Sequence, residues 1–358
     1  MRAGKGSRIM AVTITPYGKT ADGLEVQQVV LENGPYELRA LTYGATITHL
    51  FVPGRDGQKL DVLLGYSRLQ DYEKGTAYLG ALVGRNANRI ADASITIDGT
   101  VWPLVANEGT KQLHGGPGGF ASRVFEAKPE GDSAVRFILD SADGDQGYPG
   151  AVHLEAVYSL SADGAVTLDY TATTTKPTLV NITNHSYFNL AGHDAGADAL
   201  LNHTLWLDAP SFTPSDAASI PTGEIRPVAG TAFDFTAPKT LGRDIEADDL
   251  QLHQAGGYDH NWVLAGSGMR TVARLTSPDS GVWMEMATTQ PGVQVYAGNY
   301  LAGGPDSKSG APYEKRGGVA LETQYFPDCI HHEGFGDPVL RPGQTYRQTT
   351  VYRFGRED

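Results

Sequence analysis

The sequence has a single cysteine, Cys329, among its 358 residues. One thiol cannot form an internal disulfide, and it cannot supply a zinc site built from several cysteines. Other metal signatures are also missing, because no His-x-His, His-Glu-x-x-His or EF-hand pattern occurs. His331 and His332 are adjacent, so on a strand they would point to opposite faces and could not ligate one ion together. We therefore expect no metal, and we expect Cys329 to be an ordinary buried or surface thiol.

Long apolar runs are absent as well, since no stretch approaches the roughly 18 apolar residues that a membrane span requires. Near the N-terminus, Arg2, Lys5 and Arg8 are not followed by the apolar segment of a signal peptide. We therefore expect no membrane association. Residues 1–12 are predicted to form a short disordered leader, and the cytoplasm is the expected compartment.

Basic residues are outnumbered, with 28 Lys and Arg against 41 Asp and Glu and a net charge of −13 at pH 7. A chain this acidic repels phosphate backbones and anionic lipids, which excludes nucleic acids and membrane surfaces as favoured partners. A Gly-x-Ser-x-Gly elbow is missing, and so is a phosphate loop ending in Gly-Lys-Ser/Thr. The sequence therefore favours neither a serine hydrolase nor a nucleotide-binding fold of that type.

Helical patterning is scarce. Residues 67–73 and 244–253 are each predicted to form a few helical turns, but neither has the apolar stripe of a core helix. Glycine and proline are frequent, at 44 and 20 residues, and they supply the dense turns that suit many short strands. Residues 191–199, rich in Gly, Asp and Ala, are the strongest candidate for a loop.

The dominant pattern is instead a period-two alternation of apolar residues. In the clearest case, residues 152–160 and 166–172 alternate on both sides of Asp163-Gly164, which is typical of a β-hairpin. The pattern recurs at residues 95–102, 272–286 and 346–354. It predicts an all-β fold, a large antiparallel β-sandwich or barrel. The length alone would allow two domains, but no break in composition divides the chain, so we expect residues 13–358 to form one domain.

Polar residues that strands and turns do not need gather in a few segments: GRNANRI (84–90), LHGG (113–116), NITNHSYFNL (181–190), GYDHNW (257–262), TQPG (289–292) and LETQYFPD (321–328). Arginines and asparagines among small residues suit hydrogen bonds to a polyol, although structural arginines in a solvated loop would give the same composition. A histidine beside two glycines can be approached closely by a ligand, because glycine has no Cβ. The polar groups of residues 181–190 need partners if they are buried, so a satisfied core histidine is the alternative to a functional one.

Glu322 ends the apolar run of residues 318–321. A carboxylate in apolar surroundings has a raised pKa unless it is paired, and that is one way in which a general base usable near neutral pH is made. Glu322 is therefore a candidate general base.

Seven segments, taken together and in this order, resemble the aldose 1-epimerase family, the galactose mutarotases. The segments are GRNANRI (84–90), LHGG (113–116), GYPG (147–150), NHSYFNL (184–190), YDHN (258–261), TTQPG (288–292) and LETQ (321–324). The resemblance implies the galactose mutarotase-like supersandwich, a large antiparallel β-sandwich with a sugar cleft on one face. It also implies an isomerase that interconverts the α and β anomers of free aldoses by acid–base ring opening and closure.

The resemblance implies roles for particular residues. In proteins that this one resembles, the histidine of the NHSYFNL segment and the glutamate of the LETQ segment catalyse, which implies His185 and Glu322. It further implies a set of residues that hold the hydroxyls of a monosaccharide, namely Arg89, His114, Asp259, Asn88 and Gln290.

The reaction itself sets what the catalytic pair must do. The O1 hydroxyl loses a proton and the ring oxygen gains one, so one base and one acid are needed. Free Glu and His have pKa values of about 4.3 and 6.5, so we expect ionised Glu322 and protonated His185 as the resting pair. No cofactor, metal or covalent intermediate is required.

Two other functions fit parts of the sequence. A sugar-phosphate 1-epimerase would need extra basic residues for a dianionic phosphate, and a chain of net charge −13 shows little sign of them. A non-catalytic carbohydrate-binding domain would have no reason to retain both an acid and a base.

Overall fold

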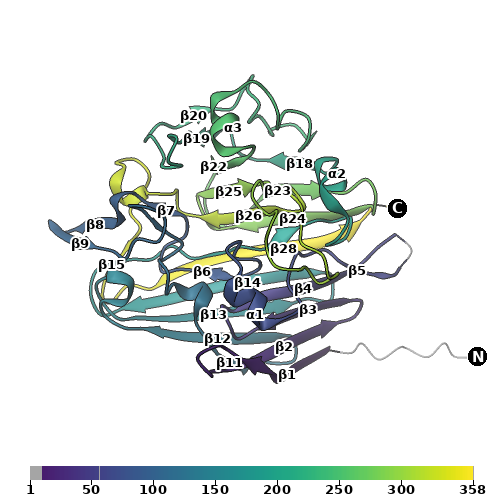
Figure 1. The fold of residues 1–358 in the computed structure, drawn as a ribbon, viewed down its shortest axis with the longest axis horizontal. Helices are drawn as coiled ribbons and strands as arrows, with labels where there is room; N and C mark the ends of the chain where they lie inside the picture. The colour runs from purple at the N-terminus through teal and green to yellow at the C-terminus, as the bar shows by residue number, and fades with distance from the viewer. Residues whose placement is uncertain (1–9, 56, 358) are drawn as a thin grey trace, which may run out of the picture.

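The computed structural model describes residues 10–357 with the exception of residue 56. Within that range, the strands form three larger sheets of nine, six and five strands and four separate pairs. The α-helices described are three and short. In Figure 1 the long strands run across the lower part of the molecule, and the six-stranded sheet lies above them. This arrangement confirms the predicted all-β, antiparallel fold.

The nine-stranded sheet is antiparallel throughout. Its strands, in spatial order, are β11 (Glu126–Pro129), β12 (Ala134–Ser141), β13 (Val152–Leu160), β14 (Ala165–Thr174), β28 (Tyr346–Arg356), β24 (Val282–Thr288), β23 (Arg270–Thr276), β18 (Thr204–Leu207) and β21 (Lys239–Thr240).

The other sheets are smaller. The six-stranded sheet consists of β17 (Tyr187–Phe188), β26 (Val319–Gln324), β25 (Gly292–Tyr296), β22 (Asp259–Val263), β19 (Ser211–Thr213) and β20 (Arg226–Pro227). The five-stranded sheet consists of β1 (Met10–Lys19), β2 (Glu25–Asn33), β3 (Tyr36–Leu41), β4 (Thr46–Pro53) and β5 (Lys59–Asp61). The pairs are β6 (Leu82–Val83) with β16 (Thr183–Asn184), β7 (Arg89–Ile90) with β10 (Gln112–Leu113), β8 (Ser94–Ile97) with β9 (Thr100–Pro103), and β15 (Thr178–Leu179) with β27 (Val339–Leu340).

The predicted hairpins are all present. β13 and β14 pair around the Asp163-Gly164 turn, β8 and β9 pair around Asp98-Gly99, and β23 pairs with β24. β13 alternates strictly between buried and less buried residues, and β14 does so over most of its length. Alternation therefore identified these strands because one face of the sheet packs inward and the other meets water.

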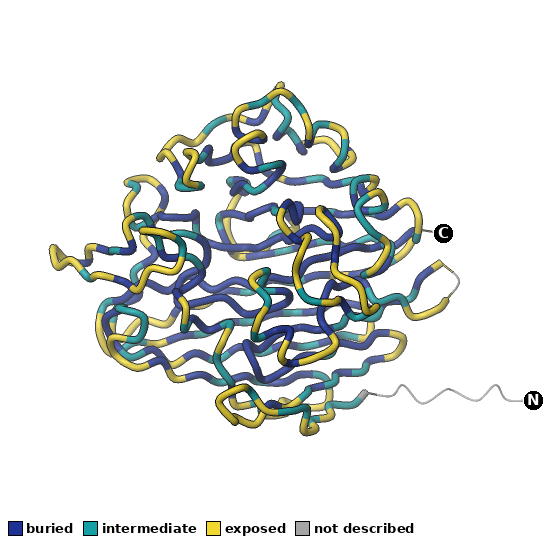
Figure 2. The backbone as a smooth tube through the Cα atoms, viewed as in Figure 1, coloured by how far each residue is buried: buried dark blue, intermediate teal, exposed yellow. Residues whose placement is uncertain are grey.

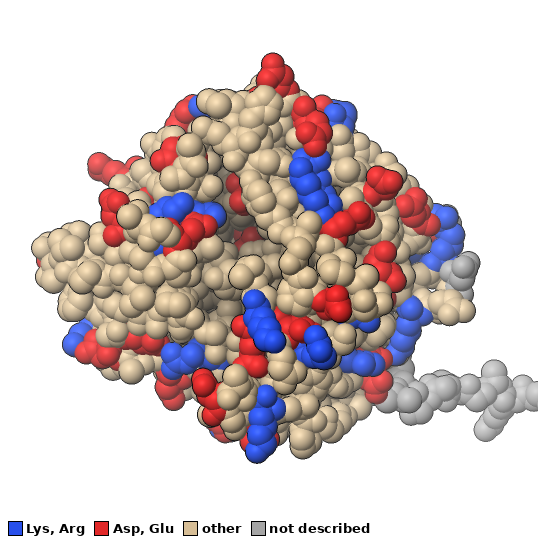
Figure 3. Space-filling view, in the orientation of Figure 1, with Lys and Arg blue, Asp and Glu red and all other residues tan. Residues whose placement is uncertain are grey.

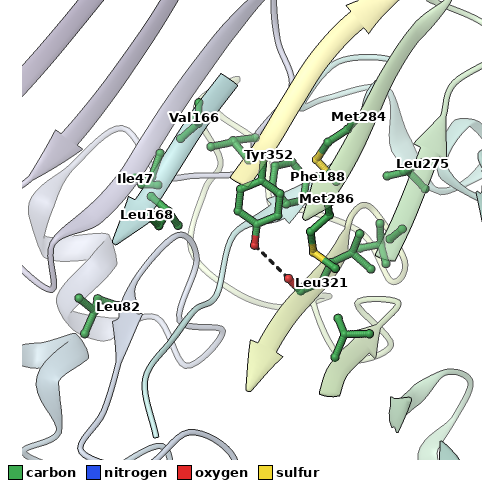
Figure 4. Close-up of a cluster of buried hydrophobic side chains, with 14 of the residues drawn as sticks. Ile47, Leu82, Val166, Leu168, Phe188, Leu275, Met284, Met286, Leu321 and Tyr352 are labelled. Carbon is green, nitrogen blue, oxygen red and sulfur yellow. Dashed lines mark hydrogen bonds between the residues drawn. The ribbon is translucent and has the colours of Figure 1, made fainter. Parts of the chain in front are cut away.

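One large hydrophobic cluster joins the nine-stranded sheet to the two smaller ones. Figure 2 shows the buried residues along the strands and the exposed ones at the turns and outer loops. In Figure 4, Met286 of β24 lies near Leu321 of β26, while Leu168 of β14 lies near Ile47 of β4. The nine-stranded sheet is thus one layer of a sandwich, with the six-stranded and five-stranded sheets packed on it.

The helices are α1 (Leu69–Lys74), α2 (Gly196–Leu201) and α3 (Leu250–Ala255), with 3-10 turns at η1 (Ala91–Ala93), η2 (Phe120–Ser122), η3 (Asp145–Gly147) and η4 (Cys329–His331). α1 and α3 fall within or at the end of the two segments predicted to be helical, and the Asp249 carboxylate caps α3 by accepting from the backbone N–H groups of Gln251 and Leu252. α2 begins inside residues 191–199, which were expected to be a loop. None of the helices described is long and apolar enough to cross a membrane.

The N-terminal boundary differs from the prediction. β1 begins at Met10, so residues 10–12 of the expected leader lie in the five-stranded sheet, where Val12 pairs with Leu31. Val12 and Ile14 pack against the core, which accounts for their place in a strand. Residues 1–9 of the predicted leader lie outside the described residues.

Candidate active site

A cavity of about 250 Å³ opens beside the six-stranded sheet. Figure 3 shows a hollow on this face, over the position of β25 and β26 in Figure 1, with acidic atoms in its depth. Its lining comes from eight segments of the chain: Thr76, Ala77, Tyr78, Asn88, Arg89, Glu108, Leu113, His114, His185, Tyr187, Ser219, Gln254, Ala255, Asp259, Tyr296, Tyr300, Leu301 and Glu322. Six of the seven residues predicted for the site are among them.

The sheet itself carries a row of polar side chains that reaches the cavity at Glu322. β22, β25 and β26 pair so that Asn261, Gln294 and Glu322 lie side by side on the same face. Since side chains alternate along a strand, Leu321 points the other way, into the core of Figure 4. Gln294 Nε2 donates to Asp259 Oδ1 at 2.7 Å, which fixes that carboxylate at the cavity wall.

His185 reaches Glu322 from the segment between β16 and β17. Its backbone N–H donates to the Ala81 carbonyl, and its own carbonyl accepts from the Gly80 N–H, both at 2.9 Å. His185 Nε2 then lies 3.4 Å from Glu322 Oε1, and both side chains are almost fully buried. His185 Nδ1 and Glu322 Oε2 make no hydrogen bond within the described residues. A buried acid and a buried base are therefore in contact.

Aromatic rings surround the His185 imidazole. The Tyr187 ring lies 5.0 Å away at 30° and the Tyr78 ring 6.0 Å away at 26°, while His114 meets it edge-on at 5.1 Å. Tyr78 also has a left-handed backbone, with φ of 54°, which is unusual for a bulky residue. These rings limit the orientations that the imidazole can adopt.

Burial has a larger effect on the pKa values of His185 and Glu322 than their contact with each other. Burial lowers the pKa of His185 to about 4. Burial raises the pKa of Glu322 well above its usual value, as does Asp259, whereas Arg89 lowers it. The expectation of a resting ion pair is therefore not what these surroundings favour: removing two charges from water costs more than their mutual attraction returns. Burial therefore favours the neutral forms of both groups, in which the shared proton lies on Glu322 rather than on His185.

His114 is fixed as a hydrogen-bond donor. The Asn88 backbone N–H donates to His114 Nδ1 at 3.1 Å, and the His114 backbone N–H donates to the Asn88 carbonyl, also at 3.1 Å. Because Nδ1 accepts, the proton of the neutral ring is on Nε2. Burial, together with His185 and Arg89, lowers the pKa of His114 well below its usual value. His114 thus offers an N–H to a ligand.

That tautomer also bears on metal binding. His114, His185 and Glu322 each offer one possible ligand atom, and these three atoms lie within 4.8 Å of one another. Among the described residues, this is the one cluster of His, Cys, Asp or Glu side chains close enough to share a metal ion. A metal-bound histidine donates from its other ring nitrogen, whereas His114 Nδ1 accepts. The three residues therefore do not fit a metal centre.

Arg89 is held in place by an acidic neighbour. Its Nε and Nη2 donate to the two carboxylate oxygens of Glu108, at 2.7 and 2.9 Å, and Lys111 Nζ contacts the same carboxylate at 3.1 Å. Burial works against the charged form, but Glu108, Asp259 and Glu322 together raise the pKa of Arg89. A bidentate pair of this kind fixes the plane of the guanidinium.

Gln290 is not part of the cavity. It lies between the two layers of the sandwich, where its Nε2 donates to Tyr346 Oη at 3.1 Å and its backbone N–H donates to Thr288 Oγ1. The prediction placed it among the sugar-binding residues. The turn between β24 and β25 instead directs its side chain to the nine-stranded sheet, and Gln294, four residues later, occupies the polar row.

Two other polar motifs have structural roles. Arg85 is buried and donates to the carbonyls of Pro149 and Gly150 at 3.0 and 2.8 Å, so the alternative of a structural arginine holds for this residue. His331 and His332 belong to the end of a 3-10 turn rather than a strand, and both face Asp328. The expectation that they would point apart is therefore wrong.

Several residues of the cavity were not predicted from the sequence, among them Glu108, Tyr78, Tyr187 and Tyr296. Gln294 had a usable signal, because a glutamine between two valines in GVQVY (292–296) interrupts an apolar strand as Glu322 does. Glu108 had none, since it lies in an ordinary polar loop and its role depends on Arg89.

Comparisons with known proteins place the chain in a family. A family model described as aldose 1-epimerase matches residues 27–353. The chain is 40% identical over 348 residues to a galactose mutarotase of Bos taurus, covering 97% of this chain and 99% of the relative. It is 38% identical over 338 residues to an aldose 1-epimerase of Escherichia coli (strain K12), covering 93% and 96%. The solved structure of a galactose 1-epimerase from Lactobacillus acidophilus NCFM has a TM-score of 0.86 at 27% identity, covering 98% of this chain and all of that chain.

Proposed function

The chain belongs to the aldose 1-epimerase family and interconverts the α and β anomers of aldoses, and we propose that Glu322 and His185 carry out its proton transfers. The observation that carries this proposal is the contact of His185 Nε2 with Glu322 Oε1, 3.4 Å apart at the wall of the cavity. The two groups lie close enough to act on the same pyranose, whose O1 and ring oxygen are bonded to one carbon.

The proposed reaction moves two protons. Glu322 takes the proton of the O1 hydroxyl while His185 gives one to the ring oxygen, and the C1–O5 bond breaks to give the open-chain aldehyde. Rotation about C1–C2 presents the other face of the carbonyl. Closure reverses the two roles, with His185 as the base and Glu322 as the acid, and yields the other anomer. A positioned proton-transfer group of this kind contributes roughly 10²–10⁴ in rate.

The neutral resting pair is compatible with this scheme. Ionised Glu322 with protonated His185, and protonated Glu322 with neutral His185, contain the same single proton. Burial favours the second form, while Arg89 favours the ionised carboxylate. Moving the proton within the pair therefore prepares it for ring opening without uptake of a proton from water. The pH limits of activity belong to the pair as a whole.

Four polar residues of the cavity are proposed to hold sugar hydroxyls. His114 offers its Nε2–H, Asp259 offers carboxylate oxygens, and Arg89 retains Nη1 beyond its two bonds to Glu108. Asn88 sets the tautomer of His114 through its backbone and also lines the cavity. Donors and acceptors of both kinds suit a free monosaccharide, which has a hydroxyl on almost every carbon.

The two rival functions fit the cavity less well. Arg89 is the one Lys or Arg among the residues that line it, and Glu108 already engages this arginine. Glu108, Asp259 and Glu322 would repel a dianionic phosphate, which argues against a sugar-phosphate substrate. A carbohydrate-binding module would have no use for a buried acid–base pair, because burying both groups costs stability.

Polarimetry tests the assignment. The parent protein should speed the mutarotation of the α-anomers of galactose, glucose, xylose or arabinose, and a hexose 6-phosphate should react more slowly. His185→Asn should lower kcat by about 10²–10⁴ while the melting temperature stays within a few degrees. A folded His185→Asn variant that works at the parent rate would remove His185 from the mechanism.

A further inference from the structure

We propose that Asp328 is a positioning residue for this reaction, which ties the strand carrying Arg89 to the segment that follows Glu322. Asp328 is buried and does not line the cavity. It stands six residues after Glu322 in the chain. The proposal rests on the role of Arg89 in binding the sugar, as argued above.

The first half of this tie is formed with β7 and the residue after it. The Asp328 backbone N–H donates to the Arg89 carbonyl at 3.2 Å. Asp328 Oδ1 accepts from the Ala91 N–H at 3.0 Å. Asp328 therefore bonds to the main chain on both sides of Ile90, through its own main chain at Arg89 and through its side chain at Ala91.

The second half comes from the turn that follows Asp328. His331 Nδ1 lies 2.7 Å from Asp328 Oδ1, and His332 Nε2 lies 3.6 Å from Oδ2. The hydrogen bond to Asp328 raises the pKa of His331, which favours its charged, donating form. A buried carboxylate is costly unless it is paired, and His331 supplies the hydrogen-bonded partner, with the His332 ring beside it.

The position of β7 depends on such local contacts. It has only two residues, Arg89 and Ile90, and it pairs with the equally short β10 rather than with any of the larger sheets. Glu108 fixes the guanidinium end of Arg89, but it does not fix the main chain from which that side chain extends. Asp328 fixes this main chain relative to β26, and so relative to Glu322.

The backbone at Asp328 suggests a suitable variant. Its φ is 54°, in the left-handed region that Asp and Asn tolerate better than most residues. Asp328→Asn keeps that preference and the size of the side chain. It removes the negative charge, so the remaining amide oxygen accepts more weakly from the Ala91 N–H and from His331, both of which bond to Oδ1 in the parent. Asp337→Asn is the matched control, because Asp337 is exposed and, among the described residues, its side chain accepts from the Val339 N–H of its own turn alone.

The test is a double-mutant cycle between Asp328→Asn and Arg89→Ala, read as KM and kcat for galactose. Asp328→Asn alone should raise KM about tenfold, within the usual range for residues coupled through contact, with kcat within about twofold of the parent. In the Arg89→Ala background the same change should alter KM by less than about twofold. Asp337→Asn should change neither constant.

Other outcomes separate this proposal from the proposed function. An equal effect of Asp328→Asn in both backgrounds, or an unchanged KM, would overturn the positioning role. A parent-like KM in Arg89→Ala alone would instead refute the proposed role of Arg89, and the positioning role with it. If Asp328→Asn does not fold, His331→Gln replaces it in the cycle. That variant leaves the carboxylate in place, should raise KM less, and should likewise have no effect without Arg89.

Discussion

The β13–β14 hairpin and strand β26 belong to the same sandwich, but the faces that they turn away from the core have different surroundings. β14 alternates between buried and less buried residues over most of its length, whereas all six residues of β26 are buried. One face of each strand packs into the same core, through Leu168 in β14 and Leu321 in β26. The other face of β14 is partly open to water, while that of β26 carries Glu322 into the cavity.

A polar side chain on an exposed face is explained by its contact with water, whereas a buried polar side chain needs another explanation. On β14 a polar side chain on the outer face is hydrated and costs little. On β26 the Glu322 carboxylate is removed from water without a cation in contact, so it costs stability. A fold retains such a residue where its chemistry is needed. We therefore expect mutations in the two strands to have opposite effects. A core substitution on β14 should lower stability and spare activity, whereas substitution of Glu322 should lower activity without a loss of stability.

The largest expected effect is on catalysis, at Glu322. Glu322→Gln keeps the shape of the side chain and removes the base, so kcat should fall by about 10²–10⁴. KM should change much less, because Arg89, His114 and Asp259 still hold the hydroxyls. The control is Glu285→Gln on β24, whose carboxylate is partly exposed and pairs with Arg274. Polarimetry at saturating α-galactose measures both, and a parent-like rate for Glu322→Gln would show that Glu322 is not the base.

The same contrast explains what the sequence could predict. The β13–β14 alternation and the Asp163-Gly164 turn were readable, because one face of that hairpin meets solvent. Glu322 and His185 were found through motifs, as were Arg89, His114 and Asp259. Gln290 was misplaced because a TQPG turn does not tell which layer its glutamine faces. Glu108 was missed because its importance comes from a contact 19 residues away in sequence with Arg89, and local patterns do not carry such pairings. The charge state of the pair depends on burial, which the motifs do not show.

The second effect concerns stability, at Leu168. This side chain is buried in the core on β14, so Leu168→Ala should leave a cavity and lower the free energy of unfolding by about 2–5 kcal/mol. Its activity per folded molecule should stay near that of the parent, because Leu168 does not line the active-site cavity. Urea unfolding and polarimetry on the same preparation measure the two quantities. A loss of kcat as large as that of Glu322→Gln would contradict the separation of the two regions.

The third effect is a pH-dependent gain in stability. In the folded state burial raises the pKa of Glu322, so the folded chain holds this proton more tightly than the unfolded chain, where the pKa is about 4.3. The stability contributed by this group is complete below about pH 4.3 and is lost as the pH rises toward the folded-state pKa. Glu322→Gln has no such loss, so its advantage over the parent should grow from acid to neutral pH. His185 is common to both proteins, so its own titration largely cancels.

Thermal melts of the two proteins without sugar, from about pH 4 to pH 8, measure this difference. A melting temperature that is higher in Glu322→Gln at pH 7, and equal at the acid end, is the expected result. A difference that shrinks as the pH rises would mean that Glu322 is stabilised as the charged form. Leu168→Ala is the control, because its loss of stability should not depend on pH.

The smallest effects come from two glutamines on opposite sides of the sheet, Gln294 and Gln290. Gln294 orients the Asp259 carboxylate through a 2.7 Å hydrogen bond, so Gln294→Ala should raise KM by about 3- to 10-fold with little change in kcat. Gln290 bonds Tyr346 Oη between the layers. Gln290→Ala should therefore lower the free energy of unfolding by about 1–3 kcal/mol and leave KM unchanged. Because the substitution is the same, the two variants compare the loss of side-chain hydrogen bonds on the two sides of the sheet. A rise in KM for Gln290→Ala equal to that of Gln294→Ala would return Gln290 to the sugar-binding residues and show that the polar row on β22, β25 and β26 does not alone define the site.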